Sequence, residues 1–325
     1  MGPLVFEPLL YQIRWGGRKL GTLLNKPIGA AQDYAESWEL ADHANGQSVV
    51  ARGPLTGITL SELVRHQGPE LLGVHSEQNQ FPLLIKFLDA NDWLSLQVHP
   101  NDRQAVSYNP SENGKTEAWV ILDAEPGSEI ICGLKPGVTR EQLAEHLHAG
   151  TVSEIVHRIP AAAGDCFYVP AGTVHALGPG IVLAEVQQQS NLTFRLHDWG
   201  RLGSDGKPRP IHVQESLDCT DYAAGPVDPV TPRELGDGEH CFEELVRCQH
   251  FVIRRHQGIN PFHLKLGNRF RILMLLEGSA TLSTNDSTSP TETLKKGETT
   301  LLPACLHEAH IHPESAITLL EILLP

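Results

Sequence analysis

Short hydrophobic stretches, separated by glycine, proline and polar residues, dominate the chain and predict strands rather than long helices. Residues 81–89 are almost uniformly hydrophobic, which is typical of a strand buried on both faces, and Lys86 alone interrupts them with a charge before the final Asp89. Residues 94–99, 181–186 and 270–278 also have the character of strands. We therefore expect a mainly β fold made of many short strands.

Helix start signals occur only in the first half of this pattern. Thr59 with Glu62, and Thr139 with Gln142, have the spacing of a capping box, in which two side chains satisfy each other's backbone amides. We expect these helices as insertions between strands. Residues 217–235 contain three prolines and indicate a linker. This predicts a first domain at 1–216 and a second at 236–325.

Composition narrows the function classes. The 325 residues carry a formal net charge of −14 and no long run of Lys or Arg, which argues against nucleic-acid binding. No hydrophobic run approaches the length of a membrane span, and the start of the chain lacks the features of a signal peptide. Six cysteines without a C-x-x-C pair suggest buried thiols in a reducing compartment, so we expect a cytoplasmic protein.

The most specific motif lies at residues 164–175, which fit the pattern Gly-x5-Pro-x-Gly-x2-His. This is the second signature of the cupin barrel. Gly164 turns the chain, a short apolar strand follows, Pro170 ends it, and Gly172 allows a backbone conformation that other residues resist. We therefore expect two cupin-type (jelly-roll) β-barrels, with the helical insertions confined to the N-terminal half.

Four side chains in this region are candidate metal ligands. Gln97 and His99 are two residues apart on a predicted strand, so they share a face. Glu117 and His175 add a carboxylate and a second imidazole. Such a set suits Zn²⁺ or another first-row divalent ion. With 17 histidines in the chain, a hydrogen-bonding role for a single one of them is the alternative, but the combined spacing favours a metal site.

Three cations accompany these candidates. Lys115 precedes Glu117 by two residues, so it either binds a substrate anion, orients the carboxylate, or is a surface lysine. Arg195 lies in an alternating segment with Thr193 and His197 on the same face; it either faces an anionic ligand or pairs with Asp198 or Glu185. Lys86 either faces the barrel interior or reaches toward water from a strand end.

A weaker copy of the motif follows in the second half. Residues 297–307 resemble the signature weakly, with Cys305 in place of the second glycine, and no Gln-x-His or His-x-His precedes them. We expect a degenerate second barrel without metal. The alternative is a metal site formed by His307, His310 and His312 themselves.

Together these motifs resemble type I mannose-6-phosphate isomerase in its short bacterial form. The resemblance is carried by residues 82–100, 114–117, 171–176 and 193–198, with further likeness at Trp15-Gly16-Gly17, Glu36-Ser37-Trp38-Glu39 and Pro208-Arg209-Pro210-Ile211-His212. It implies one Zn²⁺ per chain, held by Gln97, His99, Glu117 and His175. It also implies catalytic roles for Arg195 and Lys115, and a sugar phosphate as the small-molecule substrate.

The implied reaction is aldose–ketose isomerisation of mannose 6-phosphate and fructose 6-phosphate through a cis-enediol. Two other kinds of cupin are the alternatives: an Fe²⁺-dependent oxygenase and a non-enzymatic sugar-binding protein. Gln97, where an oxygenase would carry histidine, argues against the first. Lys115 together with Arg195 argues against the second. The sequence leaves the general base and the oligomeric state open.

Overall fold

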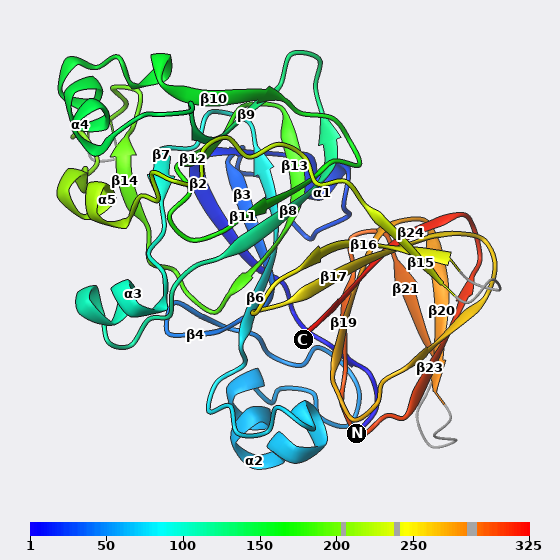
Figure 1. Ribbon diagram of the computed structural model, residues 1–325. Helices are drawn as coiled ribbons and strands as arrows, with labels where there is room; N and C mark the ends of the chain where they lie inside the picture. Colours follow the sequence, from blue (N-terminus) through cyan, green and yellow to red (C-terminus); the bar gives the residue numbers. More distant parts are fainter. Residues whose placement is uncertain (203–205, 237–240, 285–290) are drawn as a thin grey trace.

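The computed structural model describes residues 1–202, 206–236, 241–284 and 291–325. Two lobes make up the molecule, one formed mainly by the N-terminal half and one by the C-terminal half (Figure 1). All paired strands between named elements are antiparallel, and the expected mainly β fold is confirmed.

Two sheets form the N-terminal lobe. The six-stranded sheet has the order β11 (Cys166–Val169), β8 (Glu117–Ala124), β13 (Ile181–Gln188), β6 (Leu83–Ala90), β3 (Tyr34–Leu40) and β2 (Leu9–Gly17). The five-stranded sheet has the order β10 (Val156–Pro160), β9 (Glu129–Leu134), β12 (His175–Leu177), β7 (Leu96–Val98) and β14 (Phe194–His197). Buried residues of both sheets, such as Trp119, Leu183 and Ile130, share one core between them.

Two further sheets form the C-terminal lobe. The seven-stranded sheet has the order β1 (Leu4–Val5), β22 (Thr299–Leu302), β19 (Arg271–Glu277), β24 (Ile317–Leu323), β17 (Val252–Gly258), β16 (Cys241–Arg247) and β15 (Arg233–Gly236). The four-stranded sheet has the order β18 (Phe262–Lys265), β23 (Glu308–Pro313), β20 (Ser279–Thr284) and β21 (Glu292–Lys295). A small hairpin joins β4 (Asp42–His43) to β5 (Gly46–Gln47). Among the described residues no sheet closes on itself, so the predicted barrels are pairs of open sheets.

Every helix of the described residues precedes residue 220, and the last of them lies beyond the N-terminal half, to which helical insertions were expected to be confined. They are α1 (Lys19–Thr22), α2 (Leu60–Leu72), α3 (Asp102–Tyr108), α4 (Arg140–Ala149), α5 (Val213–Cys219) and the 3₁₀ turn η1 (Val152–Glu154). The capping boxes predicted at Thr59 and Thr139 begin α2 and α4, and Asn101 with Gln104 forms a third at α3. None of the helices in the described part of the chain is long and apolar enough to span a bilayer.

A hydrophobic core also joins the two lobes. Ile85 and Phe87 of β6 point away from the N-terminal sheet pair and pack with Ile272 of β19 and Ile322 of β24 in one buried cluster. The next residues along β6 face the other way: Leu88 belongs to the core inside the N-terminal lobe. Because side chains alternate along a strand, Lys86 is therefore turned toward the interior of that lobe.

The connection between the halves is packed onto the N-terminal lobe. The Val227 amide donates to Cys132 O and the Val230 amide to Cys166 O, and β15 begins at Arg233. Strand β1, from the start of the chain, pairs with β22 of the C-terminal lobe. The division into domains at 1–216 and 236–325 stays a prediction.

The cysteines differ in part from expectation. Cys132, Cys166 and Cys219 are buried thiols, and Cys248 and Cys305 are partly buried. Cys241 is exposed, so the expectation of buried thiols is wrong there.

Candidate metal centre and cavity

Three predicted site residues form one row across the five-stranded sheet. Gln97 of β7 lies directly opposite His175 of β12 on one side and opposite Arg195 of β14 on the other. Directly opposed residues in antiparallel strands carry neighbouring side chains. Strand pairing thus brings together three residues separated by up to 98 positions in the sequence (97 to 195).

The connection from β11 to β12 carries His175 from one sheet to the other. Gly172 in this connection has φ +91°, the left-handed region that glycine adopts most readily, and its amide donates to His99 O over 2.9 Å. A Cβ at this position would lie 3.0 Å from Asp221 Cβ. The predicted role of Gly172 is therefore confirmed: it lets the chain turn against the strand of His99.

His99, Glu117 and His175 converge in the interior of the N-terminal lobe. Their ligand atoms lie within 4.8 Å of one another, and all three residues are buried. His175 Nε2 is 3.3 Å from Glu117 Oε1, and His99 Nε2 is 3.7 Å from Glu117 Oε2. Within the described ranges this is the only group of three or more His, Cys, Asp or Glu residues with such geometry.

The remaining nitrogens of the two imidazoles are held by the backbone. His99 Nδ1 lies 3.0 Å from Leu192 O, and His175 Nδ1 lies 2.9 Å from Thr173 O. A carbonyl can only accept, so both Nδ1 atoms carry the proton and both Nε2 atoms present a lone pair to Glu117. Burial lowers the pKa of His175 to about 4 and that of His99 well below its ordinary value, so both rings are neutral.

Glu117 carries a buried charge that its protein neighbours only partly compensate. Lys115 Nζ lies 2.6 Å from Glu117 Oε2 and 3.2 Å from His99 Nε2. Burial nevertheless raises the pKa of Glu117 to about 7, against the opposing effect of Lys115. Two imidazole lone pairs and an undercompensated carboxylate are a donor set that fits a divalent cation.

Gln97 completes this donor set. The end of its amide group lies 3.3 Å from His175 Nε2. The oxygen and nitrogen of an amide exchange places by a flip, so either atom can face the group. The structure therefore brings together all four residues predicted as ligands.

A second row of adjacent side chains crosses the facing sheet. Lys86 of β6 lies opposite Glu185 of β13, which lies opposite Trp119 of β8. Glu185 Oε1 is 3.2 Å from Lys86 Nζ, and Glu185 Oε2 accepts from Trp119 Nε1 over 3.1 Å. Burial favours protonation of Glu185, but Lys115 and Lys86 keep its pKa below the ordinary value.

A cavity of about 350 Å³ opens beside these two rows. Its charged lining residues are Lys86, Lys115, Arg195, Arg209, Glu36 and Glu185. Four cations against two carboxylates leave an excess of two positive charges, in a protein of net charge −14. Gln97 and Lys115 also line the cavity, and they contact the buried histidines beneath it. A locally positive pocket of this kind attracts an anionic ligand.

Arg195 is not engaged by either predicted carboxylate. Its Nη1 donates to Pro210 O over 2.9 Å, and among the described residues its buried Nε has no hydrogen-bond partner. Asp198 pairs with Arg201 and Arg209 instead. Burial lowers the pKa of Arg195 and the charge of Arg209 lowers it further. Two guanidinium groups that repel each other beside a cavity are suited to an anion between them.

Some of the cavity lining was missed from the sequence. The sequence indicates Glu185 only as an ion-pair partner for Arg195, although alternation along residues 181–186 places it on the same face as Leu183, inside the lobe. Lys86 does face the interior, the first of the two interpretations that its position allows. His197 does not follow Arg195 into the cavity, because the strand register shifts between them and His197 packs on Trp199.

The second motif forms no comparable group. Strand β22 and the following turn pass from the seven-stranded to the four-stranded sheet, as β11 does in the N-terminal lobe. His307 and His312 are exposed, and His310 lies beside His263, with 6.2 Å between ring centroids. The three histidines do not bring their ligand atoms together in the described part of the lobe.

The N-terminal lobe is a β-sandwich of two antiparallel sheets. Between the sheets lie buried imidazole and carboxylate donors, and a cationic cavity lies above them. This arrangement suits a protein that binds a metal ion and an anionic ligand. Residues 6–146 match the family described as phosphomannose isomerase type I, catalytic domain. Mannose-6-phosphate isomerase ManA of Bacillus subtilis is 37% identical over 94% of each chain. Mannose-6-phosphate isomerase of Streptococcus mutans is 40% identical over 66% of this chain and 67% of its own.

The fold agrees with this assignment. The crystal structure of mannose 6-phosphate isomerase from Bacillus subtilis superposes with a TM-score of 0.90 over 99% of each chain, at 30% identity. The chain belongs to the type I phosphomannose isomerase family, and the resemblance drawn from its motifs is confirmed.

Proposed function

We propose that this enzyme interconverts mannose 6-phosphate and fructose 6-phosphate and that it depends on one Zn²⁺ per chain. The observation that carries the proposal is the adjacency of two features: the donors Gln97, His99, Glu117 and His175, and a cavity with an excess of positive charge. The first suits a divalent ion and the second suits a phosphorylated sugar. The names of the relatives supply the particular substrate.

The ion would be held by the two imidazole Nε2 atoms, the carboxylate of Glu117 and the amide oxygen of Gln97. When bound, zinc supplies a Lewis acid that polarises a carbonyl or hydroxyl oxygen of the sugar. One carboxylate and three neutral donors leave the centre with a net charge of +1, which favours the negative charge that develops on the substrate oxygens.

The reaction moves a proton from C2 to C1. A base removes the C2 proton while the C1 oxygen gains one, giving the cis-enediol; loss of the proton on O2 and protonation of C1 then give the ketose. Glu36 and Glu185 are the two carboxylates that line the cavity within the described residues, and both contact Lys86. Lys115 lies between Glu117 and the cavity and is placed to stabilise an enediolate oxygen.

Arg195 would bind the negative charge of the substrate. Its Nε lacks a hydrogen-bond partner among the described residues, and its planar group can donate two parallel hydrogen bonds to a phosphate or an enediolate. The neighbouring Arg209 is held by Asp198 and adds a second fixed cation. We also infer that each pair of facing sheets is a cupin-type sandwich, because β11 and β22 make the same passage between sheets.

A coupled assay tests this function. Purified protein should convert mannose 6-phosphate to fructose 6-phosphate, and should be far less active on free mannose, which cannot use the cationic cavity. Dialysis against a chelator should remove the activity and zinc should restore it. Full activity after complete removal of metal would contradict the proposal.

A further inference from the structure

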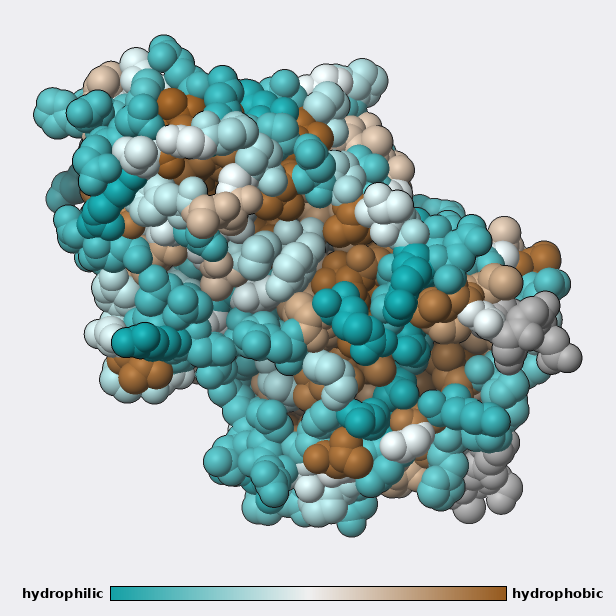
Figure 2. Space-filling view, in the orientation of Figure 1, coloured by the Kyte–Doolittle hydropathy of each residue, from teal (hydrophilic) through white to brown (hydrophobic). Residues whose placement is uncertain are grey.

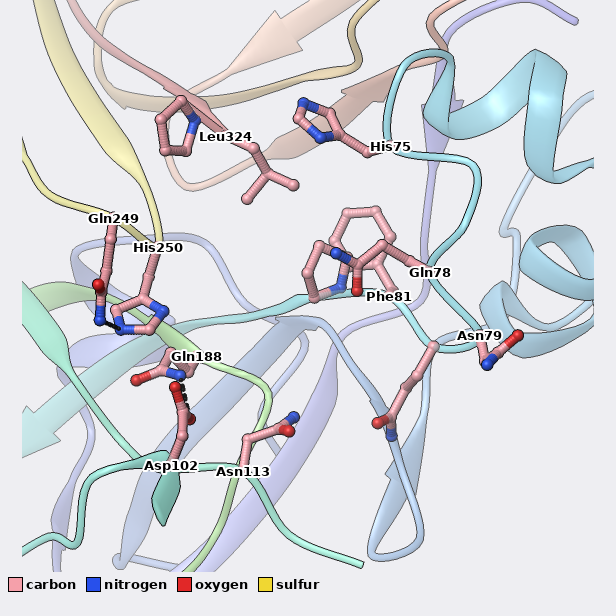
Figure 3. A pocket seen from close by; sticks show the side chains of 13 residues that line it. His75, Gln78, Asn79, Phe81, Asp102, Asn113, Gln188, Gln249, His250 and Leu324 are labelled. Atoms are coloured by element: carbon pink, nitrogen blue, oxygen red, sulfur yellow. Dashed lines mark hydrogen bonds between the residues drawn. The ribbon is translucent and has the colours of Figure 1, made fainter.

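A second cavity of about 490 Å³ lies between the two lobes, and no step of the proposed reaction uses it. Its walls come from five parts of the chain: the connection from α2 to β6, the start of α3 with the loop before β8, the end of β13, the turn between β16 and β17, and residues 324–325. Figure 3 shows Gln249 and His250 on one side of this cavity, with Gln78 and Asn79 across from them. Both hydrophilic and hydrophobic residues are exposed on the surface between the two lobes (Figure 2). A volume of this size suits a small ligand.

The lining is rich in side-chain amides. They are Gln78, Asn79, Gln80, Asn113, Gln188 and Gln249. Each amide offers both a donor and an acceptor, as a hydroxyl group does. Asp102 adds a carboxylate acceptor, and Phe81, Pro82 and Leu324 add an apolar surface. Alternating polar and apolar contacts of this kind match the hydroxyl groups and C–H faces of a polyhydroxylated molecule.

The cavity carries no permanent positive charge among its described lining residues. None of them is a lysine or an arginine, whereas four line the cavity near the metal donors. Arg269 is not a lining residue, although it contacts two residues that are, His75 and Pro325. Burial lowers the pKa of both His75 and His250, so neither ring is charged at neutral pH. A phosphorylated ligand therefore finds no counter-charge here, and a neutral one does not need it.

This cavity shares a wall with the loop that carries Lys115. Asp102 Oδ1 accepts from the Gly114 amide and from Gln188 Nε2, both over 2.9 Å. Gln188 Oε1 in turn accepts from the Thr116 amide over 2.9 Å. The backbone on both sides of Lys115 is thus held by two residues that line the cavity, and the bond between Asp102 and Gln188 is drawn in Figure 3.

The loop has little room to move independently of this wall. A Cβ at Gly114 would lie 2.4 Å from the Asp102 backbone nitrogen, so the loop packs directly on the first turn of α3. The Lys115 amide also donates to Pro100 O over 2.9 Å. A ligand that hydrogen-bonds to Asp102 or Gln188 would therefore alter the support of the Lys115 backbone. The side chain of Lys115 in turn reaches the proposed metal donors, because its Nζ contacts Glu117 and His99.

We propose that the cavity between the lobes is a second ligand site for a neutral polyhydroxylated molecule, an unphosphorylated sugar or sugar alcohol, and that its occupancy is coupled to the loop of Lys115. The existence of the site does not depend on the proposed function. Only the effect of its ligand on catalysis rests on that function.

Binding of mannitol, a hexitol without phosphate, tests the site by titration calorimetry on the full-length, zinc-loaded protein. Saturable binding is expected for the wild type. Gln249→Trp and Asn79→Trp place a bulky ring at two exposed positions of the wall, and each should weaken binding at least tenfold. Gln257→Trp, at an exposed glutamine outside this cavity, and Arg195→Ala, in the other cavity, should bind mannitol as the wild type does.

Hydrogen–deuterium exchange tests the coupling without any assay of activity. Mannitol should slow exchange of the Gly114 and Thr116 amides in the wild type and not in Gln249→Trp. The proposal is overturned if mannitol fails to bind saturably, if the two tryptophan variants bind it normally, or if Arg195→Ala abolishes binding. Binding without any change in exchange at residues 114–116 would overturn the coupling. If the protein binds mannitol as expected but does not turn over mannose 6-phosphate, the proposed function fails and this site stands.

Discussion

Lys115 places its Nζ atom 2.6 Å from Oε2 of Glu117, so an ammonium group lies against the carboxylate that we propose as a metal ligand. A cation beside a divalent ion repels it, whereas a cation beside a developing enediolate stabilises it. These two effects make opposite predictions for a variant that lacks the charge. Zinc content and kcat of such a variant therefore distinguish a role of Lys115 in metal retention from a role in catalysis.

Lys115→Met should keep the metal and lose activity. Elemental analysis should find about one zinc per chain, because the four donors remain and a repulsive charge has gone. The value of kcat should fall by about 10²-fold, the usual cost of losing one charge partner of the transition state. A variant that loses zinc would show instead that Lys115 supports the metal site through Glu117.

His175→Ala should lose the metal. It removes an imidazole whose Nε2 lies 3.3 Å from Glu117 Oε1 and leaves the carboxylate buried with one histidine. His307→Ala is the control, since it changes an exposed histidine at the end of the second motif, one position before the residue that corresponds to His175. The control should retain its zinc. Loss of zinc from the control would move the metal to the C-terminal lobe.

Arg195→Ala distinguishes catalysis from ground-state binding. If the guanidinium stabilises the enediolate, kcat should fall by about 10²–10³-fold. If it only holds phosphate in the ground state, KM should rise while kcat stays near that of the wild type. Arg195→Lys keeps the charge without the planar group, so partial recovery would indicate a simple electrostatic role. Zinc content should be unchanged in both variants, and a fully active Arg195→Ala enzyme would contradict any catalytic role.

We expect the stability of the C-terminal lobe to fall in acid because of the buried carboxylate of Glu321. Burial alone would raise its pKa, but His256, Arg271 and Arg254 hold the pKa at about 2. Because the folded-state pKa is below the ordinary 4.5, the unfolded chain binds more protons between pH 4.5 and pH 2. This carboxylate therefore contributes about 3 kcal/mol to the free energy of unfolding above pH 4.5, and loses it as the pH falls toward 2.

Denaturant unfolding of Glu321→Gln at pH 7 and pH 3 measures this contribution. The variant should be less stable than the wild type at pH 7, and the difference should shrink at pH 3. Glu277→Gln, at an exposed carboxylate paired with Lys296, is the control and should change little at either pH. An equal difference at both values of pH would show that Glu321 stabilises the fold through packing rather than charge.

The grouping of the four proposed metal donors could be predicted from the sequence because their geometry is local or follows a known motif. Gln97 lies in β7 and His99 directly after its end, two residues further on, and Gly172 turns the chain that presents His175. The interior direction of Lys86 was harder to predict, since β6 is buried on both faces and hydrophobicity does not tell the two faces apart.

Other features depend on pairings between distant segments. Glu185 becomes part of the cavity because β13 lies between β6 and β8, an order that no local pattern gives. The register shift after Arg195 removes His197 from the face that strict alternation would give it. The cavity between the lobes brings Asn79 and Gln249 together from segments 170 residues apart in the sequence. The sequence alone does not indicate that these amide side chains line one cavity, because only the packing of the two lobes brings them together.

Titration of the metal-free enzyme with zinc tests the central claim most directly. Chelated protein should have no isomerase activity on mannose 6-phosphate, and activity should rise in proportion to added zinc until about one equivalent per chain is bound. His175→Ala measured in parallel should remain inactive over the same range. Activity that is already complete without zinc, or that rises equally in His175→Ala, would contradict a zinc-dependent isomerase built on Gln97, His99, Glu117 and His175.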